Sequence, residues 1–256
     1  MKTSFAKPAT AVKAPVKRVE PVEEEATTTE STTAIAVPET GNELSNVVSM
    51  DGQVQGEYTP RDLTIPKLNL VNKTGDLSNT FNPGSFVYNK EVVIGDGKKP
   101  ANITIKRIAK FYLQDLPYGS GETPKNFVSI RDVRAAGGAL ATDNDVEEGS
   151  DRYSEAMTCI VLVQSLEKKH PLFPFEFNGE YYALAQWLLT KSAYKQTGRK
   201  LFTDSQLALR DGIDTASYEL TSSIRTNSQG SWYVPVVKLG AKHDAKFIEF
   251  VRSLAR

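Results

Sequence analysis

The chain has 256 residues, of which 39% are hydrophobic, and its 31 Lys and Arg balance its 31 Asp and Glu to a formal net charge of zero. This length and composition favour one globular domain with a tail over two full domains. A single cysteine, Cys159, excludes an internal disulfide, and no apolar run approaches the roughly 20 residues of a membrane span or resembles a secretory signal. We therefore expect a cytoplasmic protein without a membrane partner.

Charge is divided unevenly along the chain. Residues 1–62 hold 6 Lys and Arg against 10 Asp and Glu, whereas residues 63–256 hold 25 against 21. Within the second part, residues 143–155 hold six acids and one base, so the rest of that part carries +9. A basic body with acidic appendages suits a polyanionic partner, although many proteins with neutral ligands share this pattern.

Residues 1–60 are of low complexity. Lys, Ala, Pro and Val give way to Glu23-Glu24-Glu25 and then to Thr, Ser and Glu, with almost no aromatic residues. Such a segment cannot bury enough apolar surface to offset the entropy lost on ordering. We expect a disordered tail over residues 1–60 and a single β-rich domain over residues 61–256.

Short β segments open the predicted domain. Residues 63–71 form either a helical turn or an edge strand, because Pro66 excludes a central strand. Strands are expected at 85–88, 91–94 and 101–113, with turns at Asn89-Lys90 and at residues 95–97. Residues 115–150 are expected to be a loop-rich excursion that is weakly helical over 133–138.

The middle of the chain predicts a buried strand and a hairpin. Residues 156–166 are a continuous apolar run that contains Cys159, so a buried structural thiol is expected there. Phe175 and Phe177 alternate with polar residues before Asn178-Gly179, a typical two-residue hairpin turn.

Residues 183–210 are rich in helix formers and are interpreted as the main helical region. Gly198 is expected to break the helix, and Thr203-x-x-Gln206 resembles a capping box for a second one. A last hairpin is expected over residues 218–239 around the Asn227–Gly230 turn, with Trp232 and Tyr233 on opposite faces. Asp244 is expected to cap a C-terminal helix.

Enzymatic chemistry finds little support. The two histidines, His170 and His243, lack metal-ligand spacing, and the acidic run from Asp143 lacks the glycine and glutamate of a calcium loop. The glycine-rich stretch 119–125 lacks the Gly-Lys-Ser/Thr ending of a phosphate loop, and no Gly-x-Ser-x-Gly occurs. We expect no catalytic residue, no metal and no cofactor.

Basic residues interleave with aromatic ones in three places. Single-strand binders combine a cationic groove with aromatic platforms on which bases stack. The alternative is that the aromatics belong to the core and the cations to ordinary solvated faces. The candidate nucleic-acid-binding residues are Lys106, Arg107, Lys110 and Tyr112 in the first cluster, Lys191, Tyr194, Lys195, Arg199 and Lys200 in the second, and Arg225, Trp232, Tyr233 and Lys238 in the third.

Three short motifs carry a resemblance. They are Ile65-Pro66-Lys67-Leu68-x-Leu70, Phe175-Glu-Phe177-x-Gly179, and Tyr218-x-Leu220 with Asn227-x-x-Gly230-x-Trp232-Tyr233-Val-Pro235. This pattern resembles a group of poorly characterised phage proteins, some of which are thought to bind single-stranded DNA during replication or recombination through an OB-like β-barrel. The chain departs from bacterial single-strand binders, since its acidic segment is N-terminal and its last residues predict an amphipathic helix.

The resulting hypothesis is an α+β, β-rich fold: an OB-like antiparallel barrel with inserted loops, one main helix region and a C-terminal helix. The expected function is largely sequence-independent binding of single-stranded DNA in phage replication or recombination, in the host cytoplasm, and the preference for DNA over RNA is left open. Replication or recombination proteins are the expected protein partners, and a homo-oligomer is left open. The alternative is a phage virion or assembly-associated structural protein without nucleic-acid chemistry.

Overall fold

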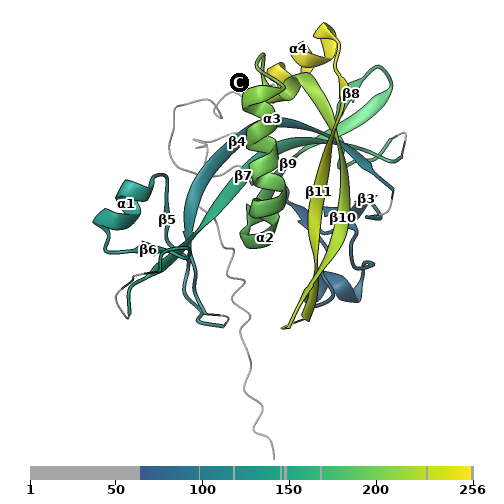
Figure 1. Cartoon of the computed structure of the whole chain (residues 1–256). Coiled ribbons are helices and arrows are strands. Elements are labelled where there is room, and N and C mark those ends of the chain that lie inside the picture. The colour runs from purple at the N-terminus through teal and green to yellow at the C-terminus, as the bar shows by residue number, and fades with distance from the viewer. Residues whose placement is uncertain are drawn as a thin grey trace, which may run out of the picture. The chain divides into compact units, whose positions relative to one another are not determined.

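The computed structural model describes residues 64–254 except 98, 118, 145, 147, 148, 168 and 229. The predicted tail over residues 1–60 lies outside the described residues. Two sheets account for most of the described part, and Figure 1 shows their strands with the helices packed on them.

The smaller sheet has three antiparallel strands in the order β1 (Leu68–Leu70), β2 (Phe86–Tyr88) and β3 (Val92–Gly95). The larger sheet has the order β11 (Gly230–Lys242), β10 (Ala216–Asn227), β4 (Ala101–Gln114), β7 (Arg152–Gln164), β9 (Glu180–Thr190) and β8 (Phe175–Phe177). Two short strands join its far end, with β5 (Asn126–Phe127) antiparallel to β4 and β6 (Ala139–Leu140) parallel to β7.

The helical segments are short. They are η2 (Asp76–Asn79), α1 (Ile130–Ala135), α2 (Lys191–Ala193), η3 (Tyr194–Gly198), α3 (Arg199–Leu207), η4 (Ile213–Thr215) and α4 (Ala245–Ser253). The segment α2–η3–α3 is one continuous helical stretch whose middle part, η3, is π-helical.

The two faces of the larger sheet carry different helices. The inner face bears alternate buried residues such as Ile103, Val161, Ala185 and Tyr218, and it packs against Leu201 of α3 in the main core. The outer face bears Leu162, Tyr182 and Leu184, and it packs against α4 in a smaller core through Phe247, Phe250, Val251 and Leu254. This alternation of strand residues between two covered faces explains why the strand sequences are rich in apolar residues.

The β-rich, largely antiparallel character of the fold is confirmed, but the strands do not close into a barrel in the described part of the chain. The smaller sheet meets β9 through a single parallel bridge, Lys67 with Gln186. It meets β10 through one backbone hydrogen bond, from Ser222 N–H to Gly97 C=O. One bridge does not make a continuous ladder, so the two sheets remain separate.

The prediction of a helix from residue 183 is wrong for its first part, because Glu180–Thr190 is strand β9. Ala183, Ala185, Trp187 and Leu189 are all buried on the inner face. Each fully buried large side chain stabilises the fold by about 1.5–3 kcal/mol. Helix propensity differs by at most about 0.7 kcal/mol per ordinary residue, so pairing with β7 decides the conformation.

The predicted break at Gly198 is also wrong. The helix runs through Gly198, and a Cβ there would lie 2.6 Å from Cδ2 of the Tyr194 ring. Glycine is therefore required for close approach and not for chain termination. Thr203 does not cap a second helix, since it lies inside α3 and its hydroxyl donates to the carbonyl of Arg199.

The predicted turns are confirmed. Asn178 and Gly179 connect β8 to β9 with φ angles of 51° and 82°, as a type I′ turn requires. The last hairpin turns between Asn227 and Gly230, which pair with each other. The Asp244 side chain accepts a hydrogen bond from Phe247 N–H at 2.8 Å and caps α4.

A β-bulge in β4 shifts its register against β7 between Ile105 and Arg107. Before the bulge, the odd-numbered Ile103 and Ile105 are buried on the inner face. After it, Lys110 pairs with Met157, which belongs to the inner core. Bulges re-aim side chains in this way, and here the shift brings the even-numbered residues beyond the bulge to the inner face.

Candidate nucleic-acid interface

The helical stretch that covers the inner face begins at Lys191, directly after β9. Lys191 has a φ of 48°, which belongs to the left-handed backbone conformation that residues other than Gly, Asn and Asp rarely adopt. The chain passes at this residue from β9 directly into α2. The Lys191 side chain is 69% exposed, so apolar burial does not explain a lysine at this strained position.

A lysine and an arginine from different elements both contact the carboxylate of Glu155. Glu155 on β7 accepts a hydrogen bond from Lys110 of β4 at 2.6 Å and from Arg199 of α3 at 2.9 Å. Both cations also lie 5.9 Å from the ring centre of Tyr194, and Lys110 lies 5.3 Å from that of Tyr112. Burial raises the pKa of Glu155, but the hydrogen bonds and charges of its two partners outweigh burial and lower that pKa.

A second acid anchors the start of α2. Asp115 lies 3.4 Å from the Lys191 ammonium and accepts a hydrogen bond from the Ser154 hydroxyl. A shallow pocket of about 170 Å³ lies between the ends of β4, β7 and β9 and is lined by these three residues and by Glu155.

The last hairpin contacts the same helical stretch from the other side. The indole N–H of Trp232 donates to the Ser192 hydroxyl at 3.1 Å, and the Arg225 guanidinium donates to the Gln196 side chain. Trp232 pairs with Arg225 across the hairpin, so one cation and one aromatic reach α2–η3 from neighbouring strands.

We call this surface the α2 face. It is defined by five cations and two half-buried aromatics, namely Lys110, Lys191, Lys195, Arg199, Arg225, Tyr112 and Trp232. With Glu155 and Asp115 as the two acids, its formal net charge is +3. The structure therefore brings together parts of all three sequence clusters.

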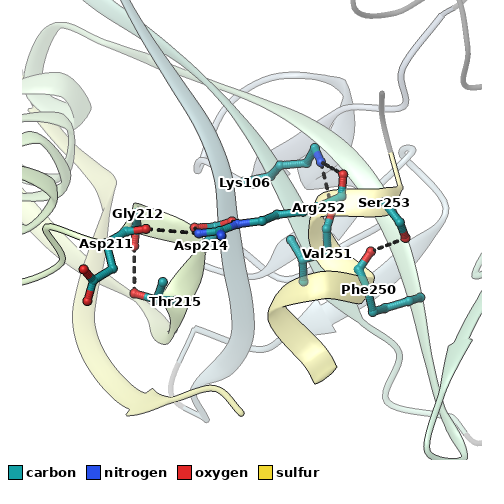
Figure 2. Close-up of polar contacts among 9 residues, drawn as sticks. All are labelled: Lys106, Asp211, Gly212, Asp214, Thr215, Phe250, Val251, Arg252 and Ser253. Atoms are coloured by element: carbon teal, nitrogen blue, oxygen red, sulfur yellow. Dashed lines mark hydrogen bonds and ion pairs between the residues drawn. The ribbon is translucent and has the colours of Figure 1, made fainter. Parts of the chain in front are cut away.

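Other predicted site residues lie elsewhere. The Lys106 ammonium lies 2.8 Å from the Val251 carbonyl and 3.3 Å from that of Arg252, at the end of α4 (Figure 2). Arg107 follows the bulge and pairs with Ile160. Lys238 pairs with Glu219 at 3.2 Å on the same hairpin as Trp232, six residues further along β11. The bulge separates the first two from Lys110, although all three are near neighbours in sequence.

Three further predicted residues have mainly structural contacts. Tyr194 is only 5% exposed and cannot offer a free stacking surface. Lys200 pairs with Asp204 one turn along α3. Tyr233 is half-buried, its ring lies against Gly84, and its N–H donates to Asn72 at 2.8 Å. Trp232 and Tyr233 thus contact different elements, as expected for neighbours in a strand.

Sequence reasoning missed Glu155, Asp115, Ser192 and Gln196 as partners of the cations. Glu155 contributes to the negative charge of residues 143–155, and the charge count alone does not distinguish it from the acids before it. One signal was available, since Glu155 is directly followed by the apolar run and a charge at a strand's start faces one side of the sheet. The bulge that places Lys110 opposite it has no comparable signal.

Other reactive groups lie apart from the α2 face. Cys159 is fully buried, and burial raises the pKa of its thiol above the usual range. His243 lies on the outer face, where its ring shares a hydrogen bond of 2.9 Å with Thr104 and lines a pocket of about 210 Å³. No group of three or more His, Cys, Asp or Glu within the described residues could hold a metal ion.

Comparisons of the chain with family models, curated protein sequences and solved structures found no match. Within the described part of the chain, no helix is both long and apolar enough to cross a membrane.

Proposed function

We propose that the protein binds single-stranded nucleic acid, with DNA as the favoured ligand, through the α2 face. The observation that carries the proposal is that Lys110 and Arg225, from two separate strands, meet one helical stretch that itself carries Lys191 and Arg199. Such a surface can follow a phosphate backbone without reading base edges, which suits largely sequence-independent binding.

Two side chains supply platforms for bases. Tyr112 and Trp232 are half-buried, so each is held by packing and still keeps part of its ring accessible. Stacking of a base on such a ring contributes about 1–3 kcal/mol. The cations and the platforms together match the composition that single-strand binding requires.

The resemblance to phage single-strand binding proteins supports the same ligand class. It also supports a role in replication or recombination and partners drawn from those processes. An OB-like relationship would rest on the antiparallel strands β4 and β7, which carry Lys110 and Glu155.

Fluorescence anisotropy of labelled oligothymidine at several salt concentrations tests the proposal. We expect log K to fall linearly with log salt, with a slope of about −0.7 for each phosphate neutralised. Lys191→Asn should weaken binding, whereas Lys238→Gln should not, because Lys238 pairs with Glu219 and lies outside the α2 face. Absence of binding at low salt would support the alternative of a phage structural protein.

A further inference from the structure

Glu155 lies between two cations of the α2 face. Its Oε1 accepts from Lys110 at 2.6 Å and its Oε2 from Arg199 at 2.9 Å, so each oxygen satisfies a cation from a different element. The side chains of Lys110 and Arg199 are 40% and 58% exposed. An anion from solution can therefore reach both cations.

We propose that the Glu155 carboxylate competes with a phosphate of the bound strand for Lys110 and Arg199. Lys110 and Arg199 form a binding site for one anion. The Glu155 carboxylate occupies this site until a phosphate replaces it. The inference rests on the proposed nucleic-acid function and describes how that site is regulated. Carboxylate and phosphate oxygens accept charge-assisted hydrogen bonds from Lys and Arg in the same way, so the exchange conserves the contacts of both cations.

The energies favour an exchange over a permanent pair. Ion pairs between partly exposed side chains contribute little net free energy, so the protein loses little when Glu155 releases its partners. The buried ring of Tyr194 has its centre 5.9 Å from each cation. This contact keeps Lys110 and Arg199 in place when the carboxylate leaves. The competitor is ionised at neutral pH because its two partners lower the pKa of Glu155 despite burial.

Glu155 differs from the other acids that contact candidate cations. Asp115 lies 3.4 Å from the Lys191 ammonium and also accepts a hydrogen bond from the Ser154 hydroxyl. Its carboxylate therefore contacts one cation and one neutral group. Glu219 contacts Lys238 at 3.2 Å, six residues along β10 from Arg225, so it holds one cation that does not belong to the α2 face. Of these three acids, only Glu155 holds two cations of the α2 face.

The test compares Glu155→Gln with Glu219→Gln in the full chain, with labelled oligothymidine as the probe. Both variants remove one negative charge from a residue paired with Lys, so a general charge effect is the same in each. We expect Glu155→Gln to raise affinity about three- to tenfold at fixed salt, as loss of two exposed pairs allows. Glu219→Gln should change it less than twofold. Thermal unfolding should show Glu155→Gln to be less stable than the wild type, because it loses two native pairs.

The salt dependence separates exchange from simple charge removal. If phosphate replaces Glu155, the wild type and Glu155→Gln neutralise the same number of phosphates, so their plots of log K against log salt are parallel. If Glu155 keeps its cations in the complex, the substitution creates a new phosphate contact and the slope steepens by about 0.7. In a Lys110→Ala/Arg199→Ala background, Glu155→Gln should no longer raise affinity.

Equal affinities of Glu155→Gln and Glu219→Gln would overturn the inference while leaving the proposed function intact. Weaker binding by Glu155→Gln would also overturn it and would show that Glu155 positions its cations for the ligand. A steeper slope would overturn the exchange. If neither the wild type nor Glu155→Gln binds at low salt, the proposed function itself fails.

Discussion

The α2 face and the outer face of the larger sheet use the same kinds of side chain for different purposes. On the outer face, Arg252 of α4 makes two hydrogen bonds to Asp214, at 2.6 and 3.0 Å, and Lys106 contacts the last carbonyls of the helix (Figure 2). A cation at a helix C-terminus interacts favourably with the helix dipole. The cations of the α2 face instead surround α2–η3 and are exposed.

The partners explain this difference. The outer cations contact backbone carbonyls and a carboxylate whose side chain is only 10% exposed, so they fix α4 to the sheet. The cations of the α2 face contact side chains that are themselves partly exposed, such as Glu155 at 27%. A cation held by partly exposed groups can exchange its partner, and this is what a binding surface needs. The burial of the partner group, and not the type of cation, therefore distinguishes the cations that fix α4 from those that can bind a ligand.

The largest effect is expected on the outer face. Phe247→Ala removes a buried ring that packs against Phe177, Tyr182 and Phe250. Loss of a buried Phe costs about 3–5 kcal/mol, and urea unfolding should show a loss near the lower end of that range. Oligonucleotide affinity of the folded protein should not change, and a clear loss of affinity would contradict the separation of the two faces.

Trp232→Ala should have its main effect on binding. The substitution removes a platform from the α2 face and should weaken oligothymidine binding by about 1–3 kcal/mol. Its matched control is the neighbouring Tyr233→Ala, since the Tyr233 ring packs against Gly84 on the other side of the hairpin. We expect the control to lower the free energy of unfolding by about 1–2 kcal/mol and to leave affinity nearly unchanged. The reverse result would assign the platform to Tyr233.

Asp214→Asn should test the anchor of α4. It removes the charge that accepts from Arg252, and because that arginine is half-exposed we expect a loss of only about 1–2 kcal/mol in urea unfolding. Arg252→Lys, which cannot make the two parallel bonds, should lose part of the same stability. Unchanged stability in both variants would show that apolar packing alone holds α4.

Lys191→Asn should reduce binding with little effect on stability. Asn tolerates the left-handed backbone better than Lys does, so removal of the charge brings no backbone strain. We expect affinity to fall by about 1 kcal/mol or less, as for one phosphate contact, and the melting temperature to stay the same or rise. A fall in melting temperature without loss of affinity would mean that the ion pair with Asp115 is purely structural.

The smallest effect concerns pH and the outer face. Burial lowers the pKa of His243 below its usual 6.5, and Asp244 and Asp214 offset this only in part. The unfolded chain then binds the proton more tightly, so this contribution to stability is complete above about pH 6.5 and is lost as pH falls through the folded pKa. Urea unfolding between pH 7 and 5 should show a loss that His243→Gln reduces. An identical pH dependence in both proteins would contradict the burial of a neutral ring at this position.

Local signals in the sequence determined several elements of this protein. The Asn178-Gly179 turn, the hairpin around Asn227–Gly230 and the Asp244 cap each depend on the conformations and hydrogen bonds of a few neighbouring residues, so a short window of sequence contains their cause. The buried strand around Cys159 was predictable because an apolar run of that length is stable only when covered. The three basic and aromatic clusters were visible for the same reason, as each lies within one segment.

Only the tertiary structure decided which members of those clusters meet. Residues 183–190 have helical composition, but pairing with β7 makes them a strand, because burial of Trp187 and Leu189 outweighs local propensity. The bulge after Ile105 directs Lys110 to the inner face and leaves Lys106 to α4, and no residue type marks it. Lys110, Glu155 and Arg199 meet through contacts between residues about 45 positions apart. Their proximity therefore could not be predicted from the sequence alone.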